Sequence, residues 1–142
     1  MFEEAMKSEG KCLYCNQIFS QKEIGKHLTK HLAEMEKTGN GSKTQTYCHI
    51  VTEADLMFLH LLVKGNTAMR TIDDFLKAIW LECCGHLSEF GHKNFMVSMN
   101  HQVQDVFNTG VKIFHDYDFG TTTRVFLNGL KSYRLNLKAS II

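Results

Sequence analysis

The sequence predicts an α+β fold in which a small N-terminal ββα-like unit is attached to an antiparallel sheet packed with about two helices. Three patterns indicate this class: closely spaced Cys and His pairs near the N-terminus, one strong helical apolar period, and several alternating apolar and polar runs. A polar segment at residues 38–45 separates the pairs from the other patterns. We therefore expect a unit at residues 1–37, a linker at 38–45 and an α+β body at 46–142.

The composition is that of a folded protein with one ordinary core. Of the 142 residues, 44% are hydrophobic and 22% are charged, and the net charge is only +1, so binding to nucleic acid or an anionic membrane would need a local basic patch. No run approaches the roughly 18 consecutive apolar residues of a membrane span, and the first residues lack a signal pattern. The five cysteines are odd in number, which argues against a disulfide framework and favours the reducing cytoplasm.

Four residues near the N-terminus have the spacing of a metal site. Cys12 and Cys15 are spaced C-x2-C, His27 and His31 are spaced H-x3-H, and eleven residues separate the two pairs. Zn²⁺ takes four tetrahedral nitrogen and sulfur donors, which a tight Cys turn and two His on successive turns of one helix can supply. These four residues are therefore the predicted ligands of one structural zinc ion, whose binding would supply the folding energy of so short a segment.

The residues between the ligand pairs fit this interpretation. Phe19 and Ile24 provide a small apolar plug, and Ser20 and Glu23 have the spacing of a helix capping box. The segment resembles the two-Cys two-His zinc-finger family, with one residue fewer between Phe19 and Ile24 than is usual. The positions that would face DNA bases in that family, Ser20, Glu23 and Lys26, do not form a guanine-reading set, and one finger reaches only about 3 base pairs.

Three lysines recur every four residues along the predicted finger helix. Lys22, Lys26 and Lys30 are candidate nucleic-acid-binding residues, because such a stripe can contact phosphates. Residues 1–38 hold six Lys and six Glu, however, and this balance favours the alternative of a solvated helix face.

The body begins with two short apolar runs, residues 46–52 and 56–63, which predict a hairpin, although the second run is also compatible with a helix. A helical period then predicts a helix that Thr71 caps together with Asp74 and that Gly85 ends. The apolar face of this helix would contain Ile72, Phe75, Leu76, Ile79, Trp80 and Cys83.

The C-terminal part predicts a shorter helix at residues 100–108, ended by Gly110, and then three strands at 111–117, 121–128 and 132–139. The inward residues of the helix would be Val103, Val106 and Phe107. We expect turns at residues 118–120 and at Asn128-Gly129 to join these strands.

Three stretches of the body, Thr71–Leu76, Trp80–Phe90 and Tyr117–Thr123, resemble the plasmid ORF-three-like family, also called transposon passenger proteins. The resemblance covers about residues 46–130, and some members are similar in carrying an N-terminal finger. It implies an α+β fold and an association with mobile elements, but the family has no settled biochemical activity. Members continue into a segment with further Cys pairs, which this sequence does not contain.

Other chemistry-bearing residues have weaker patterns. Cys83, Cys84, His86 and His92 lie close in sequence, but their spacing is not that of a chelating set, so we expect one zinc ion and no second one. His60 lies in an apolar run and is expected to be a hydrogen-bonded core residue. His115, Asp116 and Asp118 bring acid and base types together, yet alternation places His115 and Asp116 on opposite faces and no nucleophile accompanies them.

Together with the resemblance, these patterns favour a zinc-binding, non-catalytic module that binds DNA or RNA. The association with mobile elements is what the resemblance implies. The alternative is a protein-protein interaction or scaffold protein with a purely structural finger, which the nearly neutral charge favours. An enzyme is the third hypothesis, and it would need a polar constellation that the linear sequence does not assemble.

Overall fold

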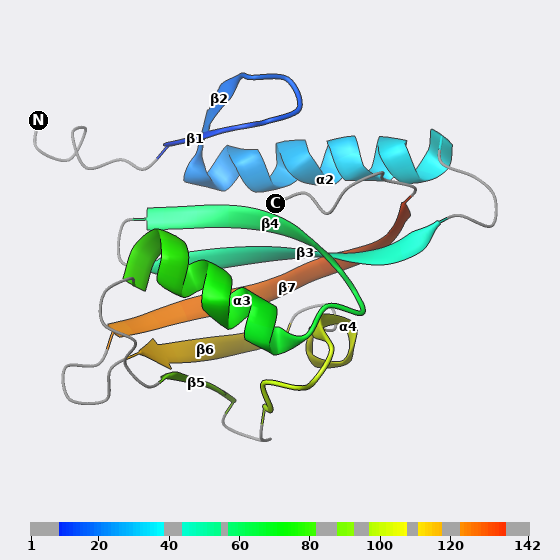
Figure 1. Cartoon of the computed structure of the whole chain (residues 1–142). Helices are drawn as coiled ribbons and strands as arrows, with labels where there is room; N and C mark the ends of the chain where they lie inside the picture. The colour runs from blue at the N-terminus through cyan, green and yellow to red at the C-terminus, as the bar shows by residue number, and fades with distance from the viewer. Residues whose placement is uncertain are drawn as a thin grey trace, which may run out of the picture.

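The computed structural model describes residues 9–38, 44–54, 57–81, 88–92, 97–107, 111–117 and 123–135. In this part of the chain, a two-stranded hairpin and a helix precede a five-stranded antiparallel sheet with helices on both faces (Figure 1). This is the predicted α+β class. None of the described helices is both long and apolar enough to cross a membrane.

The N-terminal unit has the predicted ββα order. Strands β1 (Glu9–Lys11) and β2 (Ile18–Ser20) pair antiparallel, and helix α2 (Gln21–Thr38) follows directly. The Ser20 hydroxyl accepts a hydrogen bond from the backbone N–H of Glu23 at 3.3 Å and donates one to the Glu23 carboxylate at 2.8 Å. The predicted Ser–Glu pair therefore caps the first turn of α2.

The body is built on a single sheet in the strand order β4-β3-β7-β6-β5. Its strands are β3 (Gln45–Ala54), β4 (Met57–Lys64), β5 (Ser88–Gly91), β6 (Lys112–Tyr117) and β7 (Thr123–Leu135). The hairpin predicted at residues 46–52 and 56–63 is confirmed as β3 and β4, which pair antiparallel from the pair of Tyr47 with Lys64 to the pair of Ala54 with Met57. No sequence pattern described above predicted β5.

The main core lies between one face of the sheet and two helical segments. These are α3 (Met69–Leu76), which continues as the π-helix η1 (Lys77–Leu81), and the short α4 (Val103–Val106). Their buried apolar side chains pack against β3, β6 and β7. As predicted, Val103, Val106 and Phe107 point inward.

On the opposite face of the sheet, α2 packs over β3, β4 and the C-terminal end of β7 (Figure 1). Leu32 of this helix belongs to a second buried cluster with Tyr47, Leu62, Tyr133 and Leu135 of the sheet. Near the end of α2, the Glu36 carboxylate accepts a hydrogen bond from the backbone N–H of Arg134 at 2.7 Å. The finger helix and the body therefore share a hydrophobic core.

The predicted start of the central helix was wrong. The helix begins at Met69, its N-cap Ala68 makes no side-chain capping bond, and Thr71 is an exposed residue of the first turn. The N–H groups of Met69 and Arg70 donate instead to carbonyl groups of residues 101 and 99, at 2.8 and 2.9 Å. A distant segment thus supplies hydrogen-bond acceptors for the first N–H groups of the helix, so no local capping residue is needed.

The predicted apolar face of this helix is only partly correct. Ile72 and Leu76 are buried and Phe75 packs against the core, but Ile79 is 41% exposed. Ile79 lies in the π-helical segment, where each turn contains more residues than in an α-helix, so the phase of the apolar face shifts. Several predicted features lie outside the described residues: Cys83, Gly85, Gly110, Asp118, the turn at 118–120 and the side chain of Trp80.

The predicted turn at Asn128-Gly129 was also wrong. Strand β7 continues through both residues, because Asn128 pairs with Val51 and Gly129 with Ile50 of the same neighbouring strand. The register shifts next to this point, which leaves one additional residue, Leu130, on β7. The glycine therefore marks a β-bulge in one long strand and not a chain reversal.

Candidate metal centre

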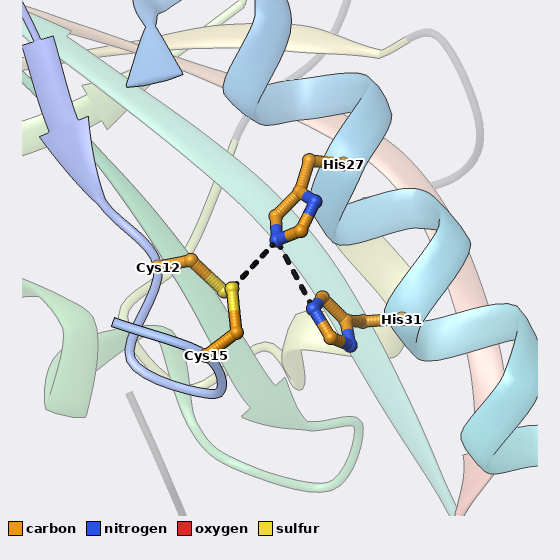
Figure 2. A group of neighbouring side chains, drawn as sticks. All are labelled: Cys12, Cys15, His27 and His31. Carbon is orange, nitrogen blue, oxygen red and sulfur yellow. Dashed lines mark hydrogen bonds between the residues drawn. The ribbon is translucent and has the colours of Figure 1, made fainter. Parts of the chain in front are cut away.

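The structure brings the four predicted ligand residues together. Cys12 and Cys15 lie in the turn that joins β1 to β2, and His27 and His31 project from α2 toward them (Figure 2). One donor atom from each residue lies within 4.8 Å of the other three. Cys12 is buried and the other three side chains are partly buried, so the donor atoms face one another beneath the hairpin.

Two of the distances between these donor atoms are close to those of a tetrahedral zinc site. The Cys15 Sγ atom lies 3.2 Å from His27 Nε2, and the Nε2 atoms of His27 and His31 are 3.0 Å apart. A tetrahedron with Zn–S bonds of about 2.3 Å and Zn–N bonds of about 2.0–2.1 Å has edges of about 3.3–3.8 Å. These two separations are thus within a few tenths of an ångström of the edges of a zinc site.

The cysteine turn has the local geometry that a chelating pair needs. The backbone N–H of Asn16 donates to the Cys12 carbonyl at 2.7 Å, and the Cys12 N–H donates to the Gln17 carbonyl at 2.9 Å. Asn16 has a φ angle of 63° in the left-handed region, which asparagine tolerates better than most residues do. This closed turn brings the two cysteines to the same side of the hairpin.

The histidines are held by aromatic and apolar neighbours. The ring of Phe19 stacks on His27 with centroids 4.1 Å apart, and Tyr14 lies 5.6 Å from His31. Ile24 is only 3% exposed, so the predicted plug is present. Burial, followed by the nearby His31 and Lys30, lowers the pKa of His27 and favours the neutral imidazole, which is the form that binds a metal.

The finger unit touches the body at two glycines. A Cβ atom on Gly10 would lie 2.9 Å from the Cδ1 atom of Ile24 and 3.0 Å from the Cζ atom of Phe58. A Cβ atom on Gly25 of α2 would lie 3.7 Å from the Cε1 atom of His60. The missing side chains therefore allow β1 and α2 to lie close to β4.

The other predicted site residues have different surroundings. Lys22, Lys26 and Lys30 are exposed, and their spacing on α2 places them away from the sheet-facing Leu32. Cys83, Cys84 and His86 lie outside the described residues, so the expected absence of a second metal set stays a prediction. Within the described ranges, the Cys12–His31 cluster is the one group of three or more potential ligands that can hold a metal ion.

The histidines of the body have partners that the sequence did not reveal. His60 hydrogen-bonds His49 at 2.9 Å, as predicted, but it is only partly buried and belongs to neither core cluster. His115 Nε2 lies 2.6 Å from the Oδ1 atom of Asp73. Asp116 lies on the other face of β6, as alternation predicted, where it accepts two bonds from Arg124 at 2.7 and 2.8 Å. The His115–Asp73 contact joins residues 42 apart in sequence, whereas the other two pairs join neighbouring strands across 11 and 8 residues.

No family model matches this chain, and neither a curated protein nor a solved structure matches it. The resemblance of the body to the plasmid ORF-three-like family therefore stays a prediction.

Proposed function

We propose that this protein is a non-catalytic module in which one structural Zn²⁺ holds the finger unit together and the exposed side of α2 binds nucleic acid. The observation that carries the metal part is the convergence of two Cys and two His donor atoms within 4.8 Å of one another. Four protein ligands complete the tetrahedral shell and leave no position open for substrate, which is the pattern of structural zinc sites.

The position of the site supports a structural role for the metal. His27 and His31 lie on the side of α2 that faces the hairpin, while Leu32 packs into the sheet. An ion bound here would fasten the hairpin to a helix that is already part of the body's core. The energy of metal binding would then stabilise the contact of Gly10 with Phe58.

The nucleic-acid part of the proposal rests on the outer side of α2. Four exposed lysines lie on this side: Lys22, Lys26, Lys30 and Lys37. At about 100° per residue, their positions fall within about 80° of one another around the helix axis. Such a row suits the phosphate backbone of a nucleic acid. The docking of α2 on the sheet leaves this side free, and exposed Glu23 disfavours base reading, so we expect binding without sequence preference.

Fluorescence anisotropy tests this proposal directly. Zinc-loaded protein is titrated into labelled DNA and RNA, single- and double-stranded, at two salt concentrations. We expect micromolar binding that weakens with salt, and a smaller salt slope, by roughly 1 for each phosphate contact removed, in the Lys22→Gln/Lys26→Gln double variant. The matched control is Arg70→Gln/Lys112→Gln, which removes the same charge from exposed positions outside α2.

Equal weakening in both double variants would show that only net charge matters and would contradict a site on α2. No binding at low salt by folded, zinc-loaded protein would reject the nucleic-acid proposal and favour the scaffold alternative. One observation supports that alternative: Leu13 and Ile18 of the hairpin are 70% and 66% exposed, and apolar side chains at such a tip can contact a protein partner. Association with mobile elements, which the resemblance implies, stays an expectation.

A further inference from the structure

A pocket of about 410 Å³ lies between the finger unit and the sheet. Its walls come from the β1–β2 hairpin, from α2 and from strands β3 and β4. Most of the wall is apolar, formed by side chains that include Leu13, Ile24, Leu28, Leu32, Phe58 and Leu62. The size and the apolar walls are typical of a small-molecule site.

The same wall contains a small set of polar groups. His49 and His60 both line the pocket, and their Nε2 and Nδ1 atoms are 2.9 Å apart. His49 is only 2% exposed, and its second ring nitrogen, Nδ1, has no hydrogen-bond partner among the described residues. Lys11 and Tyr14 also line the pocket, so an apolar ligand with one polar end would find partners at several points.

The charge of the lining selects the polar end of the ligand. Burial lowers the pKa of both His49 and His60 to about 4, with a smaller effect of His60 on His49, so both rings are neutral at pH 7. None of the described residues that line the pocket is Asp or Glu, which leaves Lys11 as the formally charged side chain among them. The His49–His60 hydrogen bond uses one of the two imidazole N–H groups, so one remains to donate to a ligand. This donor and a single cation in an apolar wall favour a monoanion over a neutral or cationic ligand.

We propose that this pocket binds a small carboxylic acid with an apolar chain or ring, its carboxylate held between Lys11 and His60. The apolar part would pack against α2 and Phe58, and the His49–His60 hydrogen bond would hold the His60 ring in position. Because the walls come from both the finger and the sheet, the site exists only where the zinc-bound finger is docked. It is separate from the exposed lysines of α2, so this inference and the nucleic-acid proposal stand or fall independently.

The test uses the full-length, zinc-loaded protein and two probes of equal chain length. Isothermal titration with octanoate is expected to show saturable binding of one molecule per chain, and 1-octanol is expected to bind at least about tenfold more weakly. The imidazole NMR signals of His60 and His49 should shift with octanoate. Lys11→Gln and His60→Phe should each reduce the octanoate affinity about tenfold or more, and the control Lys22→Gln should not change it.

Three outcomes would overturn the proposal: no saturable binding of octanoate, equal affinity for octanoate and 1-octanol, or an unchanged affinity in Lys11→Gln. Zinc content and circular dichroism check that each variant is folded. If His60→Phe does not fold, Lys11→Gln and the comparison of the two probes still decide, because Lys11 is an exposed residue of β1. Nucleic-acid binding, measured by anisotropy, should be the same with and without octanoate.

Discussion

The Nε2 atom of His115 lies 2.6 Å from the Oδ1 atom of Asp73, and this contact joins β6 to α3 across 42 residues of sequence. The Ser88 hydroxyl donates to the same oxygen at 2.7 Å, and the Lys77 ammonium lies 3.0 Å from Oδ2. Burial alone would raise the pKa of Asp73, but these hydrogen bonds hold it below its ordinary value. The serine donates to the carboxylate and not to the imidazole, so the group holds the helix to the sheet and is not a catalytic triad.

Replacing Asp73 by alanine should therefore destabilise the fold. Asp73→Ala leaves Ser88, Lys77 and fully buried His115 without their common acceptor, and we expect a loss of about 2–4 kcal/mol in the free energy of unfolding. The neighbouring Asp74 is exposed, so Asp74→Ala is the matched control and should change stability by less than about 0.5 kcal/mol. Urea unfolding followed by circular dichroism measures both variants, and equal losses would contradict the role given to Asp73.

Removing the metal should disorder the finger unit. Chelation of zinc, or His27→Ala, is expected to abolish the dispersion of the backbone NMR signals of residues 9–20 and to weaken zinc affinity by more than roughly 100-fold. The control is His101→Ala, since His101 is exposed and lies outside the cluster. A zinc-to-protein ratio near zero in the untreated protein, or an unchanged ratio in His27→Ala, would refute the metal site.

Two glycines at the contact between finger and body should respond in opposite directions to added side chains. Gly25→Ala should stabilise the protein by about 0.5–1 kcal/mol, because alanine favours the helix and its Cβ would meet only ordinary contact with His60 at 3.7 Å. Gly10→Val should destabilise it by about 1–3 kcal/mol, because its Cβ would lie 2.9 Å from Ile24 and 3.0 Å from Phe58. Thermal unfolding of the zinc-loaded variants gives both values, and a neutral Gly10→Val would argue against close docking of β1 on β4.

The buried histidine pair should make stability depend on pH. Both His49 and His60 have a pKa of about 4 in the folded protein, below the ordinary value of 6.5, so the unfolded chain binds more protons between these values. The free energy of unfolding should therefore be highest above pH 6.5 and fall progressively as the pH decreases toward 4. Acid also releases zinc in the same pH range, so the wild type must be compared with the double variant His49→Phe/His60→Phe. The free energy of unfolding of this variant should decrease clearly less between pH 6.5 and 4. Equal losses would assign the whole effect to the metal site.

The sequence by itself determined the features that depend on neighbours a few residues apart. The spacing of Cys12, Cys15, His27 and His31 was sufficient to predict their convergence, since a short turn and one helix place all four. The Ser20–Glu23 cap and the β3–β4 hairpin were predictable for the same reason, because their hydrogen bonds close over short loops.

Only the tertiary structure decided the features that depend on distant segments. The backbone N–H groups of Met69 and Arg70 find acceptors some 30 residues away, so the start of α3 needed no local cap. Asn128 and Gly129 continue β7 because β3 pairs with both, although the same dipeptide favours a turn in isolation. The docking of α2 on the sheet and the pocket beside His60 likewise result from side chains that meet only after folding. Ligand spacing and hydrogen bonds between neighbours in sequence determine the finger, whereas burial shared between distant segments determines where it lies and what surrounds it.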